Sequence, residues 1–264
     1  MNKAIWWVIL IVAAGAILSV LYYRSQQTPL RVSPPVAEAP APKPETEPEP
    51  EIRYPVEEKP QEKPLPPLAK SDPAMKDTLR DLWSDKAVAQ LFNVNEFVRR
   101  VVATVDNLPR QKIAMRLNPV KQAPGQFRVS GQGDELTVHP DNGARYATYV
   151  KVMEAMDTTR LVDAYVRYYP LFQKAYEDLG YPKGYFNDRL VEVIDHLLAA
   201  PEMPPNARLV QPKVFYQFAD PDLEKRSAGQ KAMMRIGNEN AARMKAKLRD
   251  IRGQLTRRGP KPKS

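Results

Sequence analysis

A run of twenty residues without a charged side chain, Ala4 to Tyr23, constrains this chain more than any other feature. A helix of that length spans ~30 Å, the thickness of the hydrocarbon core of a bilayer. Trp6 and Trp7 stand near one end of the run, and Tyr22 and Tyr23 stand at the other. Because amphipathic rings prefer the headgroup level, we predict a transmembrane helix over residues 4–23 with these four aromatics at the membrane interfaces.

A cleaved secretory signal is the alternative interpretation, since Ala14-Gly15-Ala16 offers a small-residue cleavage site. The apolar run continues to Tyr23, however, beyond the ~7–15 apolar residues of a cleavable signal. We therefore expect an uncut, single-pass anchor.

The expected orientation of this anchor depends on its short head, residues 1–3. Lys3 and the amino terminus nearly balance Arg24 and Arg31, so the positive-inside count is almost tied. A head of three residues is easily held in the cytoplasm while the long C-terminal part is exported. We expect an inner-membrane protein of a bacterium with its C-terminal domain in the periplasm.

Residues 24–70 hold 13 of the 27 prolines, interleaved with glutamate, lysine and small residues. Such a segment cannot bury enough apolar area to offset its ordering entropy, and its prolines favour the extended polyproline II conformation. We predict a disordered proline-rich tether that reaches on the order of 100 Å at ~3.1 Å per residue. That reach extends toward a peptidoglycan layer, although a passive spacer without a partner is the favoured interpretation.

The net charge of +9 resides at the C-terminal end, where residues 225–264 carry 13 Lys/Arg against two Asp/Glu. Such a region attracts anionic surfaces, and we expect the basic disordered tail, residues 258–264, to contact anionic lipid. Nucleic acid is the less favoured partner. The absence of cysteine excludes disulfides and thiolate metal sites.

Apolar periodicity predicts one mainly α-helical domain over residues 71–257. Helix starts are indicated at Ser71-Asp72-Pro73, Asp157 and Asp220-Pro221, where a capping residue stands at the start and, in two of them, precedes proline. Pro170 predicts a kink or a restart within a long helix that ends near Gly180.

Short strands are expected in two places. Phe127/Val129 and Leu136/Val138 alternate around Gly131 and Gly133, which predicts a small β-hairpin, and Val214 to Phe218 is expected to add a third strand.

The last helix carries a coiled-coil-like seam of about two heptads, formed by Ala241, Met244, Leu248, Ile251 and Leu255. So short a seam favours docking on the body of the domain over dimerisation.

A family resemblance is carried by these stretches: Val102–Pro109, Ala144–Tyr146, Tyr168–Leu171, Ala175–Pro182, Tyr185–Leu190, Ile194–Leu198, Phe218–Glu224 and Ser227–Lys231. Together they resemble an uncharacterised proteobacterial family, the domain of unknown function 3014, and the likeness covers most of residues 65–257. The resemblance implies an envelope protein with a single N-terminal anchor. It assigns no activity, so no catalytic residue can be transferred.

The chain lacks the standard phosphate-loop and nucleophile motifs, and we predict no catalytic residue and no cofactor. Asp188, Glu192 and His196 are spaced by four and share a helix face, where they could hold a divalent cation. Ligands would be needed from elsewhere too, so we expect no metal site. His196 instead hydrogen-bonds at the edge of a packed helix, while Asp188 and Glu192 pair with Arg189 or remain solvated.

Candidate binding residues are few, and they occur in two short stretches. They are Arg145, Tyr146, Asn187, Asp188, Arg189 and His196. Helix caps and internal ion pairs are the alternative interpretation of these residues. Nine of the twelve tyrosines lie between Tyr146 and Tyr216, and their apolar period favours a core over a glycan-binding surface.

Three functions remain open at this stage. The favoured one is an anchored protein whose periplasmic domain binds or scaffolds an envelope partner, either a protein or peptidoglycan. The second is an envelope enzyme that acts on glycan through paired carboxylates in a cleft. The third is a cytoplasmic domain whose basic tail binds nucleic acid with strong salt dependence.

Overall fold

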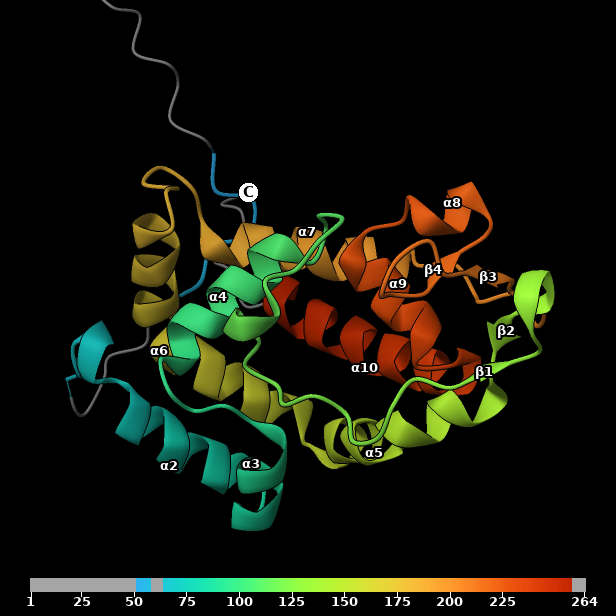
Figure 1. Cartoon of the computed structure of the whole chain (residues 1–264). Helices are drawn as coiled ribbons and strands as arrows, with labels where there is room; N and C mark the ends of the chain where they lie inside the picture. The colour runs from blue at the N-terminus through green and yellow to red at the C-terminus, as the bar shows by residue number, and fades with distance from the viewer. Residues whose placement is uncertain (1–50, 58–63, 258–264) are drawn as a thin grey trace, which may run out of the picture. The chain divides into compact units, whose positions relative to one another are not determined.

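The computed structural model describes residues 51–57 and 64–257, and most of this part is helical (Figure 1). The helices are α2 (Asp72–Leu82), α3 (Asp85–Leu91), α4 (Phe97–Asn107), α5 (Ala147–Ala155), α6 (Thr158–Asp178), α7 (Phe186–Leu198), α8 (Pro221–Glu224), α9 (Ala228–Arg235) and α10 (Asn238–Arg257). Two small antiparallel sheets pair β1 (Val129–Ser130) with β2 (Thr137–Val138) and β3 (Leu209–Val210) with β4 (Gln217–Phe218). The predicted mainly α fold with a small β element is confirmed.

None of the helices within residues 51–57 and 64–257 combines the length and apolar character needed to cross a bilayer. The predicted head, transmembrane helix and basic tail lie outside the described residues, as does most of the tether.

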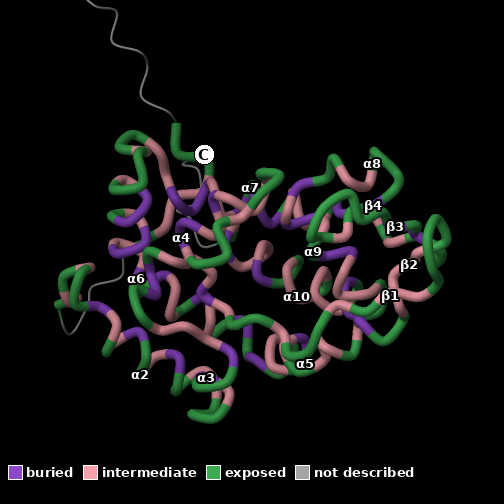
Figure 2. The backbone as a smooth tube through the Cα atoms, in the orientation of Figure 1, coloured by how far each residue is buried: buried purple, intermediate pink, exposed green. Residues whose placement is uncertain are grey.

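The core lies between several packed helices, and α10 runs through the middle of the domain between α7 and α5 (Figure 1). One apolar cluster joins α2, α4 and α6, and a second joins α6, α7 and α10. Buried positions recur along α4, α6 and α7 at helical spacing (Figure 2). On α10, Ile251 and Leu255 are buried in the second cluster, so the seam docks on its own chain as expected.

Helix α6 differs from the sequence-based expectation in two respects. It is continuous through Pro170, so no restart occurs there. The apolar period in the sequence predicts a stripe from Leu161 to Leu179, but Leu179 follows the last helical residue and is 42% exposed. Gly180, with φ +116°, then turns the chain away, as its position after the helix predicts.

Two of the three predicted caps are confirmed. The Asp157 carboxylate accepts hydrogen bonds from the backbone amides that open α6, and Asp220 does the same for α8. Ser71 does not cap α2, because its hydroxyl donates to the Leu68 carbonyl. The neighbouring Asp72 instead accepts from the amides of Glu96 and Phe97 and thereby joins the start of α2 to the start of α4.

The strands follow the predicted hairpin but correct the third strand. β1 and β2 pair with Val129 opposite Val138. In the expected strand from 214 to 218, only Gln217–Phe218 is extended and paired, and its partner β3 was not predicted. Val214 and Phe215 are 78% and 79% exposed, because they form the turn side of this second hairpin.

The folded unit begins earlier in the sequence than the expected boundary at residue 71. Leu65 and Leu68 pack against the cluster of α2, α4 and α6. Tyr54 and Val56 pack against the cluster of α6, α7 and α10. Residues 51–57 and 64–70 are therefore part of the domain, although the tether was predicted to extend to residue 70.

Candidate functional site

The candidate residues Arg145 and Tyr146 support a loop. The Arg145 guanidinium donates to the carbonyls of Pro124 and Gly125 at 3.0 and 2.9 Å, and its carbon lies 5.5 Å from the centre of the Tyr146 ring. These donors are therefore used within the chain, where they hold the backbone of residues 123–125.

The other candidate residues lie on α7, whose first turn presents Asn187, Asp188 and Arg189 in succession. Arg189 reaches across to α4, where its Nε lies 3.2 Å from the Asp106 carboxylate. Asp106 is only 2% exposed and also accepts from Arg110 at 2.7 Å and from the Tyr181 hydroxyl at 3.3 Å. A buried carboxylate needs such partners, since an unpaired charge is costly inside a protein.

Asp106 was missed by the sequence analysis as a site residue. Its signal is an ionisable residue on the buried face of a strongly apolar helix, within the Val102–Pro109 stretch that carries the family resemblance. Helix periodicity identifies that face, but it does not reveal which distant arginine balances the charge.

His196 lies two turns further along α7, and its Nε2 is 2.7 Å from the Ser227 hydroxyl oxygen. Burial lowers the pKa of His196, with the nearby Arg189 adding to the decrease. The predicted hydrogen bond at a helix edge is therefore present. Among the described residues, no group of three or more histidine and carboxylate side chains is arranged to hold a metal ion.

A polar cleft of about 350 Å³ opens beside the start of α7. Its lining includes the carboxylates of Asp106, Asp188 and Glu192. Each of them is engaged within the chain, because Glu192 accepts from Arg189 at 3.0 Å and Asp188 accepts two backbone N–H groups. Internal partners occupy both oxygens of Asp106 and of Asp188, whereas Glu192 pairs through Oε1 alone and Glu51 also lines the cleft.

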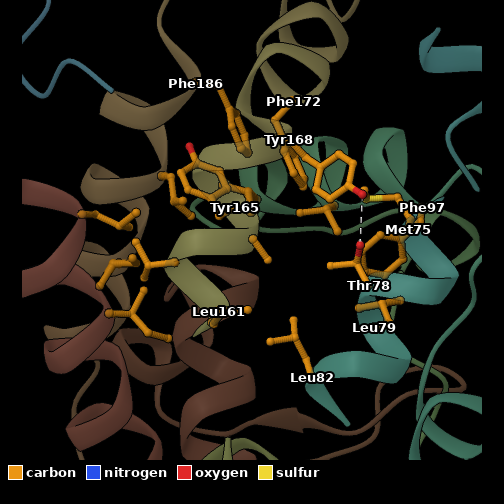
Figure 3. Close-up of a pocket in the computed structure, with 18 of the residues that line it drawn as sticks. Met75, Thr78, Leu79, Leu82, Phe97, Leu161, Tyr165, Tyr168, Phe172 and Phe186 are labelled. Carbon is orange, nitrogen blue, oxygen red and sulfur yellow. Dashed lines mark hydrogen bonds between the residues drawn. The ribbon is translucent and has the colours of Figure 1, made fainter. Parts of the chain in front are cut away.

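A second, apolar cavity of about 330 Å³ lies in the core between α2 and α10 (Figure 3). Side chains from α2, α4, α6, α7 and α10 form its walls. Tyr165, Phe172 and Phe186 gather on one side in Figure 3, and Leu82 and Leu161 lie on the other. Several wall residues, including Leu82 and Leu161, are only partly buried, so the cavity approaches the surface near them.

The few polar atoms at this cavity are paired within the protein. The Thr78 and Tyr168 hydroxyls lie 3.1 Å apart, and the Tyr165 hydroxyl donates to Asn187 Oδ1 at 3.1 Å. Burial raises the pKa of Tyr165 well above its usual value, so this hydroxyl stays a donor at physiological pH. The walls therefore present hydrocarbon and aromatic faces only.

A ligand that filled this cavity would supply apolar contacts that the wall side chains otherwise lack on that side.

Comparison with known proteins places the chain in a family without giving it a function. Residues 97–252 match the family described as "Protein of unknown function (DUF3014)", and the match covers more than half of the chain, so the chain belongs to this family. The resemblance found in the sequence is thus confirmed. The match contains α4, α6 and α7, which wall both the cleft and the cavity. No curated protein and no solved structure matches the chain.

Proposed function

We propose that this protein is a membrane-anchored envelope protein whose tethered domain binds the hydrocarbon chain of a membrane lipid. The observation that carries the proposal is the apolar cavity in the core of the domain (Figure 3). The sequence analysis favoured an envelope protein or peptidoglycan as the partner, and the cavity leads us to propose a lipid hydrocarbon chain in its place.

The composition of the cavity selects for hydrocarbon. No buried side-chain nitrogen or oxygen of the described residues lacks a partner, so the walls offer no unpaired group to a polar ligand. A dry cavity of ~150 Å³ lined by Leu, Ile and Phe is large enough to bind benzene. About twice that volume accommodates a longer, flexible chain.

The predicted anchor provides the source of such a chain. A helix over residues 4–23 would keep the domain within reach of a bilayer, and the tether would allow it to approach the surface. The basic region from 225 to 264 adds attraction to anionic headgroups.

The glycan-acting alternative is less favoured on chemical grounds. A general acid must hold a transferable proton, and a general base must have a free oxygen. The cleft carboxylates Asp106 and Asp188 instead accept hydrogen bonds from arginine and backbone donors. The internal roles of these groups support a binding protein over an enzyme.

The test is photo-crosslinking of the full-length chain in liposomes that contain a phospholipid with a diazirine in its acyl chain. We expect adducts on residues 4–23, which report the anchor, and separate adducts on cavity peptides of α2 and α6. Adducts on residues 4–23 alone would overturn chain binding in the cavity. A chain without any adduct would overturn the anchor as well.

A variant that fills the cavity supplies the specific control. Leu161→Trp extends a large ring from the first turn of α6 into the cavity and is expected to abolish the α2 adducts. Leu179→Trp adds the same ring at an exposed site just beyond α6 and should leave the adducts unchanged. Equal labelling of the two variants would contradict the proposal, and unchanged melting of Leu161→Trp would show that it is folded.

A further inference from the structure

The first turn of α7 captures a segment of the chain from more than 130 positions earlier. We call this segment, residues 51–57, the strap. The Asp188 carboxylate accepts from the backbone amides of Arg53 and Tyr54 at 2.9 and 2.7 Å. Asn187 Nδ2 donates to the Tyr54 carbonyl at 2.8 Å. Two adjacent side chains therefore hold three backbone groups of one extended segment.

The two side chains that hold the strap are buried, and one of them is charged. Asn187 is 1% exposed and Asp188 is 7% exposed, so neither side chain is left to solvent. Hydrogen bonds from N–H groups to a carboxylate are stronger than neutral ones. The position of Asp188 in the first turn of a 13-residue helix adds the favourable interaction with the helix dipole.

The side chains of the strap reach a different helix. Tyr54 and Val56 pack against the cluster formed by α6, α7 and α10. Arg252 on α10 is near the strap, and its pKa is raised first by Asp195 and also by Tyr54. The strap thus ties the start of α7 to α10.

This strap is joined to the apolar cavity through a short relay. The side-chain nitrogen of Asn187 donates a hydrogen bond to the Tyr54 carbonyl. Its Oδ1 accepts a hydrogen bond from the Tyr165 hydroxyl. The Tyr165 ring is part of the cavity wall. Ile251 and Leu255 belong both to the cluster under the strap and to that wall.

We propose that Asn187 and Asp188 form a docking site for the chain's own residues 51–57 and that docking of this strap tightens the binding of a hydrocarbon chain in the cavity. The inference rests on the proposed function of the cavity. Coupling of this kind is reciprocal, so a bound chain also holds the strap in place. Because residue 51 continues the predicted tether, extension of the tether acts on the strap first and favours release of the chain.

The test uses the full-length chain in liposomes with the diazirine phospholipid. Hydrogen exchange at the Arg53 and Tyr54 amides reports the strap, and adducts on α2 and α6, divided by those on residues 4–23, report the cavity. Asp188→Asn retains the size of the side chain but replaces one acceptor oxygen by a donor. We expect at least ~10-fold faster exchange at both amides and a several-fold loss of cavity adducts.

Matched variants separate the strap from general destabilisation. Tyr54→Ala leaves the core residues untouched and should act in the same direction as Asp188→Asn. Asp178→Asn removes a carboxylate of the same type at the end of α6, where its partners are Arg99 and Lys174, and should change neither readout. Exchange of core amides in α4 and α6 verifies that each variant is folded.

The relay is tested in a double-mutant cycle. Tyr165→Phe keeps the ring in the cavity wall and removes the hydroxyl that Asn187 accepts. Adding Asp188→Asn to Tyr165→Phe should then cause little further loss of cavity adducts. Additive losses would overturn the relay.

The outcomes distinguish this inference from the proposed function. Faster strap exchange with unchanged cavity adducts would overturn the coupling and leave chain binding intact. Unchanged exchange in Asp188→Asn would overturn the docking site. A wild-type chain with a protected strap but no cavity adducts would overturn the proposed function itself.

Discussion

Three consecutive residues on α7 bind two distant parts of the chain. Asn187 and Asp188 hold the backbone of the strap, and Arg189 balances the buried Asp106. The sequence analysis named all three as candidate binding residues, with internal contacts as the alternative. In the structure, the hydrogen bonds of all three are made to other parts of the same chain. Residue type predicts the kind of bond, but the distant partner depends on how the helices pack.

The stability of the domain should depend on pH through His196, whose pKa is lowered by burial and by Arg189. The unfolded chain has the ordinary value of 6.5, so below that pH it binds more protons than the folded chain does. The His196 contribution to stability is therefore present above pH 6.5 and is lost as the pH falls from 6.5 through the folded pKa.

We expect His196→Gln to reduce the fall in melting temperature between pH 7.5 and pH 5.5 relative to the wild type. Carboxylates such as Asp178, whose pKa is lowered by Lys174, also lose stability in acid, but they do so in both proteins. An identical pH profile for the two proteins would contradict a lowered His196 pKa.

At the scale of elements, local signals predicted the starts of α6 and α8, and long-range contacts explain the errors. Asp157 and Asp220 cap their own helices, which a window of a few residues can reveal. Asp72 caps α4 from 24 positions away, so the local pattern around Ser71 was misleading. β3 has only two residues, too few for alternation to be recognised.

Helix α9 packs closely on α4 and α7 at Gly229. The amide of Gly229 donates to the Leu108 carbonyl at the end of α4, at 2.9 Å. A Cβ built on Gly229 would lie 2.7 Å from Leu197 Cδ2 and 3.0 Å from the Leu108 carbonyl oxygen. Glycine is therefore required there for close packing of α9 on α4 and α7.

We predict that Gly229→Ala lowers the free energy of unfolding by ~1–3 kcal/mol, because the overpacking exceeds the gain in helix propensity of about 1 kcal/mol. Gly253→Ala on α10 is the matched control. Its new Cβ would meet only the flexible end of Arg257, at 3.3 Å, so stability should rise by up to ~1 kcal/mol. Urea unfolding of both variants measures the difference, and equal effects would refute the packing argument.

At the scale of the whole molecule, the sequence predicted a helical domain and the family, but neither the cavity nor the strap. A cavity arises from the fit of side chains on five helices, whereas periodicity reports only which face of each helix is buried. The proline- and glutamate-rich composition of residues 24–70 predicted disorder and did not reveal that residues 51–57 pack on the domain. Tyr54 and Val56 are sparse apolar residues among prolines and glutamates, and their burial depends on a site more than 130 positions away.

The extent of the folded unit leads to a final prediction. The described residues 51–57 and 64–257 belong to one compact unit, and the strap is part of it. A fragment of residues 49–264 is expected to fold, and a fragment of residues 64–264 is expected to fold with lower stability. Removal of the strap would leave the buried Asp188 carboxylate without its two N–H donors and the Asn187 amide without its acceptor. Loss of the partner of one buried polar group costs ~1–3 kcal/mol or more for a charge, which in a domain of about 200 residues corresponds to a decrease of roughly 2–12 °C in melting temperature.

The comparison requires a variant in which the side chain at position 188 carries no charge. In the 64–264 fragment, Asp188→Asn should recover part of the lost stability, because an amide tolerates burial better than an unpaired carboxylate. In the 49–264 fragment the same substitution should be destabilising, because it removes an acceptor that the strap uses. This reversal of sign is specific to capture of the strap by Asp188. A substitution that destabilised both fragments equally would show that residues 51–57 stabilise the domain by some other contact.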